Sequence, residues 1–270
     1  MTIIIGALCD KGKTVIFAAD KLVLFPIQSV VLGNIQKGLK LTDNCMLLLA
    51  GIPSNAGFVF KAHKEISGLA DVESMADCLA RNYRYFFMDK IVQQFLPYIG
   101  FKSFDDFQSK QATLHNLIVE DLKKAIYAFN LNVEIILGGK NKDGSGHIFQ
   151  ITHPGTFYCH DAPGFFCAGI GANRAYPIFE FCNYSVDLTK EKALGIIFLA
   201  KKRTESLGGI GSDTDIWIID EAGVNQVNDV AKNKLEKNYK EFKISYEEII
   251  KDVEVKKEET EAVPIRSKSQ

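Results

Sequence analysis

The first 20 residues constrain the fold most strongly, because two apolar segments are separated there by a short polar turn. Residues 3–9 and 15–19 contain no polar side chain apart from the thiol of Cys9. Residues 10–13 between them are Asp-Lys-Gly-Lys, and Asp and Gly favour turns. The pattern predicts a β-hairpin that begins with a buried strand. The apolar run at 45–51 likewise indicates a strand covered on both faces.

Thr2 immediately precedes the first predicted strand. We expect no leader segment before it and expect Met1 to be removed, since residue 2 is small. Thr2 would then carry a hydroxyl and a free α-amine with a pKa of about 7.7–8.0. Such an amine can take the proton of the hydroxyl, which makes the oxygen a nucleophile. Alternatively, Thr2 is an ordinary strand residue after the start codon. If Met1 is retained, the amine of Thr2 is blocked as a base and Thr2 is inert.

The composition is that of a globular protein rather than a nucleic-acid-binding or membrane protein. The chain has 270 residues, of which 47% are hydrophobic and 24% charged, enough for one large domain. The net charge of −1 argues against binding to a phosphate backbone. No apolar run reaches the roughly 18 residues of a membrane span, and no secretory signal opens the chain. We therefore expect a cytoplasmic protein that binds neither nucleic acid nor membrane.

Neither the cysteines nor the histidines predict a metal site. The six cysteines form no C-x-x-C pair, and most lie in apolar runs, as expected of buried thiols in a reducing compartment. Cys9 comes nearest to a reactive thiol, yet its neighbours do not indicate a lowered pKa. The histidines lack the spacing of metal ligands, and no glycine-rich dinucleotide or phosphate motif occurs. The sequence therefore predicts no metal and no cofactor.

The order of the predicted elements indicates an α+β fold with antiparallel sheets. Strands up to residue 51 are followed by helices, then by strands over 133–159, two more helices and a strand over 215–220. This order favours a four-layer α-β-β-α sandwich over a doubly wound parallel sheet. We expect one domain over residues 1–228, with an enlarged helical region at about 85–111 in which 101–110 form a loop or insertion. Residues 229–270 would be a charged extension, helical at first and disordered beyond 255.

Taken in order, these motifs resemble the β-subunits of the proteasome, which are N-terminal-nucleophile (Ntn) hydrolases. The resemblance covers residues 2–227 and rests on the start of the chain, the Ala-Ala-Asp that ends the second strand, and Lys37, which precedes Gly51 by the family's interval. It also rests on the segments 136–139, 147–151, 169–171 and 215–218.

The resemblance implies a role for each of four residues. Thr2 would be the nucleophile and its own amine the general base, and the charge of Lys37 would stabilise the developing alkoxide. Asp20 would hold Lys37 in place and keep it charged. The N–H of Gly51 would face the tetrahedral oxyanion.

The chain departs from the family at the residues that normally support the terminal amine. Ile170 stands where the family has a serine between two glycines. Glu205 could stand for the family's aspartate, while Gly208 or Gly209 takes the place of a second serine and Ser206 or Ser212 could compensate. These departures leave open a slow hydrolase, a differently supported site or an inactive subunit.

The resemblance also implies a pocket for the residue before the cleaved bond. This pocket would prefer apolar side chains, because a charged one would be buried without a partner. Its lining residues would be Ile35, Leu39, Leu49, Pro53 and Gly57.

The implied function is that of a threonine-type peptidase within a stacked ring of like subunits. The ring would be a homo-oligomer or contain α-type subunits, and the apolar helix at 72–96 would supply ring contacts. Unfolded polypeptide or peptide would be the substrate, and an ATP-dependent unfoldase a further partner. The alternatives are a non-catalytic ring or scaffold subunit and an Ntn amidase or transpeptidase acting on a small or specific substrate, because fold does not fix substrate.

Overall fold

The predicted hairpin forms the centre of one of two sheets. The computed structural model describes residues 2–25, 30–32 and 35–252. Within them, β1 (Ile4–Cys9) pairs antiparallel with β2 (Thr14–Asp20), and every residue of both strands is buried. Asp10, Lys11 and Gly12 have φ angles of 51°, 59° and 75°, which close the turn in the left-handed region. The prediction of a hairpin that begins with a buried strand is confirmed.

Two antiparallel five-stranded sheets contain most of the other strands. In spatial order, the first sheet consists of β10 (Phe165–Ala168), β1, β2, β11 (Thr214–Asp220) and β12 (Gly223–Gln226). The second consists of β5 (Gly38–Thr42), β6 (Cys45–Gly51), β7 (Val133–Lys140), β8 (Gly146–Thr152) and β9 (Thr156–Cys159). The short strands β3 (Val23–Phe25) and β4 (Val30–Leu32) pair with each other.

The two sheets pack face to face, with Phe17 of β2 at their contact. Its ring lies against two glycines, since a Cβ on Gly6 would come within 2.8 Å of the ring and one on Gly138 within 2.6 Å. Larger residues at these positions would force the sheets apart. The buried cluster between the sheets also contains Ile4, Leu8, Met46 and Ile136.

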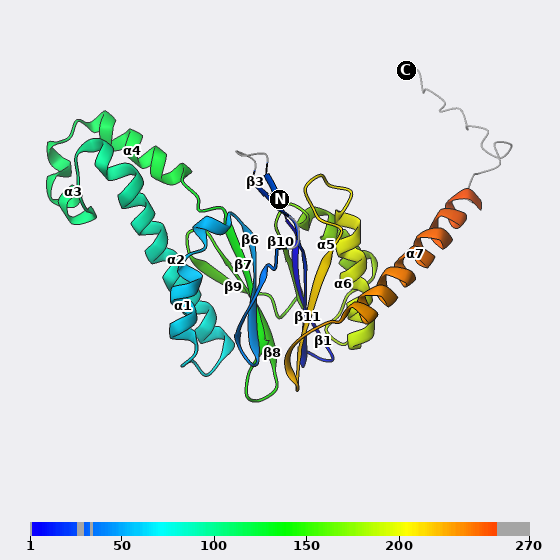
Figure 1. Cartoon of the computed structure of the whole chain (residues 1–270). Helices are drawn as coiled ribbons and strands as arrows, with labels where there is room; N and C mark the ends of the chain where they lie inside the picture. Colours follow the sequence, from blue (N-terminus) through cyan, green and yellow to red (C-terminus); the bar gives the residue numbers. More distant parts are fainter. Residues whose placement is uncertain (1, 26–29, 33–34, 253–270) are drawn as a thin grey trace, which may run out of the picture. The chain divides into compact units, whose positions relative to one another are not determined.

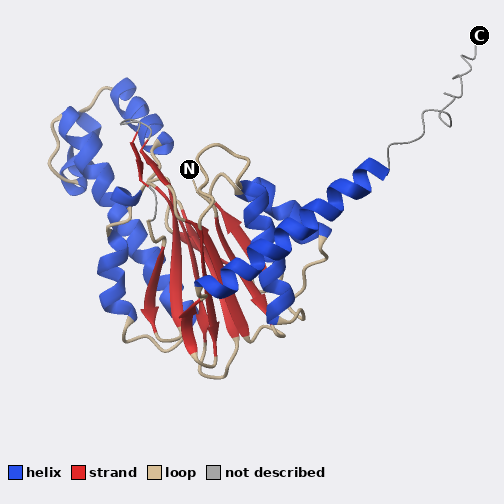
Figure 2. Cartoon of the chain, turned by 45° about the vertical axis from the view of Figure 1, so that its right-hand side comes forward, coloured by secondary structure: helices blue, strands red, loops and turns tan. Residues whose placement is uncertain are grey.

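Helices cover the outer face of each sheet (Figures 1 and 2). On the second sheet, α2 (Val72–Phe95) contacts β7 and β8, and α1 (Phe58–Ile66) packs against α2. On the first sheet, α6 (Lys190–Thr204) contacts β1 and β2, and α5 (Ala172–Phe181) packs against α6. The fold is thus α+β, with two antiparallel sheets between layers of helices.

The region after α2 is more helical than the sequence suggested. Residues 101–110 were expected to form a loop or insertion, but α3 (Phe104–Lys110) lies there, followed by α4 (Asn116–Ala128). Ser103 caps α3 by accepting a hydrogen bond from the N–H of Asp106. A small apolar cluster around Leu96, Phe101 and Leu122 holds this region together, with no sheet beneath it.

The chain divides into two compact units, Met1–Val227 and Asn228–Gln270. The second unit contains α7 (Asp229–Asp252), and the tail predicted to be disordered lies outside the described residues. Among the helices of the described part of the chain, none combines the length and apolar character needed to cross a bilayer.

Candidate functional site

Thr2, Asp20 and Lys37 form one hydrogen-bonded cluster. The hydroxyl of Thr2 donates to Oδ1 of Asp20 at 2.7 Å. The ammonium of Lys37 donates to Oγ1 of Thr2 and, at 2.6 Å, to the same Oδ1 of Asp20. Each group therefore contacts the other two, and the Thr2 hydroxyl lies between a carboxylate and a cation.

The two sheets bring these residues together from different parts of the chain. Thr2 lies just before β1, and Asp20 is the last residue of β2, so the pairing of the hairpin puts them at the same end of the first sheet. Lys37 lies just before β5 in the second sheet, and its carbonyl accepts the N–H of Leu49 in β6. Packing of the two sheets then closes the cluster.

Asp20 is the most heavily hydrogen-bonded member of the site. It is fully buried, with 0% of its surface exposed. Burial of a carboxylate is tolerated only with hydrogen bonds and an opposite charge, and Asp20 has both. Its oxygens accept hydrogen bonds from the hydroxyl of Thr2, the ammonium of Lys37 and the N–H groups of Ile3, Leu22 and Gly211.

Burial lowers the pKa of the Lys37 ammonium, and the neighbouring Asp20 carboxylate acts in the opposite direction. The side chain of Lys37 is only 6% exposed. A lysine with a lowered pKa releases its proton more readily than one in water. Lys37 can therefore stabilise a negative oxygen at Thr2 and can also exchange a proton with its neighbours.

Gly51 ends β6 in a conformation that requires glycine. Its φ is 109°, and a Cβ there would lie 1.9 Å from the carbonyl oxygen of Asn132. The N–H of Leu49 points to Lys37, and N–H directions alternate along a strand, so the N–H of Gly51 is directed to the same side. This is a suitable direction for a donor to an oxyanion near Thr2.

An apolar cavity of about 280 Å³ opens beside Thr2, Lys37 and Gly51. Of the predicted pocket residues, Ile35, Leu39, Leu49 and Pro53 line it. Gly57 does not, and a Cβ added there would instead face Phe86. The prediction had not included several other lining residues, namely Leu22, Val23, Leu47, Ala56, Val59 and Phe60.

A second cavity, of about 520 Å³, also contacts Thr2 and Gly51. It is more polar than the first and contains Glu134, which sequence analysis missed. The signal was present, because Glu134 is the one charged residue in the apolar run at 133–137. Ile170, where the resemblance would place a serine, lines this cavity and is 50% exposed. The other polar lining residues are Asn130, Asn132, Thr152 and His153.

Glu205 is connected to the cluster only through other groups. Its carboxylate accepts from the fully buried Lys201 at 2.5 Å. Lys201 also donates to the carbonyl of Gly211, whose N–H donates to Asp20. Burial lowers the pKa of Lys201, and Glu205 opposes that shift. Glu205 is thus connected to Asp20 through Lys201 and the loop that contains Gly211.

Ser206 is not brought to Thr2. Its exposed hydroxyl accepts from the guanidinium of Arg174 at 2.8 Å and donates to the carbonyl of Arg203. The carbonyl of Ser212 accepts from Lys201, so this residue also belongs to the loop around Lys201. Ser206 therefore links α5 to the end of α6 through these hydrogen bonds rather than contacting Thr2.

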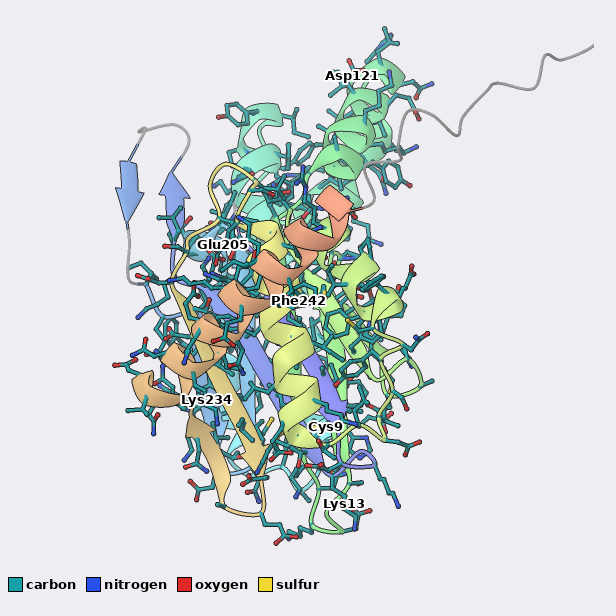
Figure 3. The ribbon with its side chains drawn as sticks, turned by 90° about the vertical axis from the view of Figure 1, so that its right-hand side faces the viewer. Cys9, Lys13, Asp121, Glu205, Lys234 and Phe242 are labelled. Atoms are coloured by element: carbon teal, nitrogen blue, oxygen red, sulfur yellow. The ribbon has the colours of Figure 1, made fainter. Side chains whose placement is uncertain are left out.

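Cys9 lies far from these residues. Figure 3 labels Glu205 near the C-terminal end of α6 and Cys9 at the opposite end of the sheet. Burial, together with the charge of Asp10, raises the pKa of the Cys9 thiol to about 12, so the thiol is not activated. Within the described ranges, no group of three or more His, Cys, Asp or Glu side chains is placed to hold a metal ion.

No model of a known protein family matches this chain, and no curated protein matches it either.

Proposed function

We propose that this protein is an Ntn hydrolase with the fold of a proteasome β-subunit, and that it cleaves peptide bonds with Thr2 as the nucleophile. The contact of the Thr2 hydroxyl with both Asp20 and Lys37, at the shared edge of two cavities, carries the proposal. A structural threonine has no need of a buried ammonium at its oxygen, whereas a nucleophile gains from it.

The proposed reaction requires cleavage of the bond between Met1 and Thr2. The released amine takes the proton of the Thr2 hydroxyl while the oxygen attacks the substrate carbonyl carbon. The N–H of Gly51 and the charge of Lys37 stabilise the resulting oxyanion. Collapse of this intermediate breaks the C–N bond, and the leaving amine takes the proton. Water then hydrolyses the ester left on Thr2.

The apolar cavity supports a substrate with an apolar residue before the cleaved bond. Among its described lining residues, Lys37 is the charged one. Following the same resemblance, we propose a ring of like subunits in the cytoplasm as the working form, with unfolded polypeptide or peptide as substrate and an ATP-dependent unfoldase as partner.

The test combines intact mass, labelling and mutation. We expect a chain that begins at Thr2 and an adduct on Thr2 after incubation with an electrophilic peptide. Thr2→Ala should abolish cleavage of a fluorogenic peptide with an apolar residue before the bond. Thr113→Ala, at an exposed threonine in the helical region, should retain it. Undiminished turnover by Thr2→Ala would rule out the nucleophile, and a fully retained Met1 would rule out the mechanism.

One observation favours a second candidate, a non-catalytic ring or scaffold subunit of the same fold. Ile170 presents an apolar side chain where the family places a hydroxyl near the terminal amine, and Ser206 lies elsewhere. A retained Met1 together with the absence of any adduct would support this candidate. A specific Ntn amidase or transpeptidase would instead form the adduct without cleaving general peptides.

A further inference from the structure

The two cavities adjoin the proposed reaction centre and differ in the rest of their lining. Thr2 and Gly51 line both of them, so a carbonyl held by these two residues would sit at their junction. The other lining residues differ: the first cavity is formed mainly around β5, β6 and α1, and the second around β7, β8 and the segment before α5. If the acyl half of a substrate occupies the first cavity, the leaving half is directed to the second.

Glu134 gives the second cavity its chemical character. One carboxylate oxygen accepts the N–H of Gly169 at 3.2 Å, and the other accepts the amide of Gln150 at 3.4 Å. Both donors are neutral, and the bond from Gln150 is longer than the usual limit of about 3.2 Å. In the part of the chain that the structure describes, no lysine or arginine pairs with Glu134. A partly buried carboxylate with only these partners has capacity for a cation.

His153 also lines this cavity. Its Nδ1 atom is buried and has no hydrogen-bond partner among the residues that the structure describes. Burial lowers the pKa of His153, so its ring is neutral near pH 7 and does not supply the missing positive charge. Among the described lining residues, the second cavity therefore contains a carboxylate, whereas the charged side chain in the first is Lys37.

We infer that the second cavity binds the leaving half of the substrate, and that Glu134 selects a basic side chain in the residue after the cleaved bond. This inference rests on the proposed function and specifies its substrate class. A lysine or arginine there would add a charge-assisted hydrogen bond to Glu134, which an uncharged or acidic residue cannot do.

The competing explanation is that Glu134 holds the amine of Thr2. The segment at Gly169 joins the two, because a Cβ on Gly169 would lie 2.5 Å from the carbonyl oxygen of Thr2, while its N–H donates to Glu134. A carboxylate partner would raise the pKa of the amine that must act as base. In that case, loss of Glu134 would affect all substrates equally and shift the acid limb of the pH profile.

The test uses internally quenched peptides that share an apolar residue before the cleaved bond and have Lys, acetyl-lysine, Gln or Glu after it. We expect kcat/KM to be on the order of tenfold higher for Lys than for acetyl-lysine. Acetylation keeps the length of the side chain and removes its charge, so this comparison needs no variant. The preference should fall as salt is raised, because salt screens the charge pair. Mass spectrometry of the products identifies the cleaved bond.

Glu134→Gln should reduce the preference for Lys to within about twofold while cleavage of the Gln peptide continues. The matched control is Glu221→Gln, in the exposed turn between β11 and β12, which should keep the wild-type preference. Thermal unfolding checks that both variants fold.

Three results would overturn the inference. The first is equal cleavage of the Lys and acetyl-lysine peptides by the wild type. The second is a Glu134→Gln variant that loses activity on every peptide by the same factor. Both leave the proposed function intact, since cleavage still depends on Thr2. The third is the absence of any Thr2-dependent cleavage and of any adduct on Thr2, which would remove the proposed function and this inference together.

Discussion

Replacing Asp20 by asparagine tests the physical basis of the site without requiring a substrate. The buried carboxylate accepts five hydrogen bonds, two of them at Oδ2, from the N–H groups of Leu22 and Gly211. With the amide oxygen placed at Oδ1, the NH₂ group of asparagine would face these two donors. Each donor left unpaired costs about 1–3 kcal/mol. Lys37 would also lose its counter-charge, and breaking a buried pair costs roughly 3–5 kcal/mol.

These terms overlap, because Lys37 can release its proton once the carboxylate is gone. We therefore expect Asp20→Asn to lower the free energy of unfolding by about 4 kcal/mol, measured by urea denaturation at pH 7. The decisive comparison is the double variant Asp20→Asn/Lys37→Met. Removing the unpaired ammonium should recover about 1–3 kcal/mol of the loss, although it changes a second buried residue.

Asp215 offers a matched control in the neighbouring strand β11. It is also buried, but within the described ranges its carboxylate accepts one hydrogen bond, from the amide of Gln226 at 3.0 Å, and lies 3.6 Å from the ammonium of Lys21. Asp215→Asn should cost about 1 kcal/mol. The reasoning is refuted if Asp20→Asn costs no more than this control, or if the double variant is no more stable than Asp20→Asn alone.

Two further predictions concern Lys37 and Gly51. Because burial lowers the pKa of Lys37, its charge is lost as the pH rises through a value below the ordinary 10.5 of lysine. The rate at which an electrophile labels Thr2 should therefore begin to fall below pH 10.5. A labelling rate that falls only at or above pH 10.5 would contradict the role proposed for Lys37. Gly51→Ala should lower kcat by at least about tenfold and destabilise the chain by about 1–3 kcal/mol, since its Cβ would clash with the Asn132 carbonyl. The control is Gly144→Ala, at an open turn with a φ of 89°, which introduces the backbone strain without the clash. An equal effect of both variants would exclude a special role for Gly51.

The sequence was sufficient to predict the hairpin and the alternation of strands and helices. Two strands joined by a tight turn can pair only antiparallel. The turn residues between the apolar segments were therefore enough to predict the α+β class with antiparallel sheets. The helix α3 was missed because Ser103 and the two aspartates after it cap a segment too short to show a clear periodicity. Its stability comes from the cluster around Leu96, a tertiary contact that local pattern does not contain.

The contact between the sheets could not be predicted from the same information. Both β1 and β2 are buried on both faces, so their apolar runs do not show which side chains point to the other sheet. The fit of Phe17 between Gly6 and Gly138 joins positions more than 100 residues apart and becomes visible only in three dimensions. For the same reason, the sequence did not show that Glu134 points to the cavity beside Thr2.

Thr2 was singled out by its place after Met1, and Asp20 and Lys37 by resemblance. The structure supplies the physical reason for their proximity, which is that each lies at or next to a strand end in one of two packed sheets. The groups that surround Asp20, in contrast, could not be predicted from the sequence. Lys201 lies in a helix whose neighbouring residues are charged, so it resembles a surface residue in the sequence, yet it is fully buried. Its ammonium binds the carbonyls of Gly211 and Ser212 and thereby fixes the loop whose N–H reaches Asp20. Glu205 pairs with this lysine, so it is connected to Thr2 through Lys201, the Gly211 loop and Asp20 rather than by direct contact.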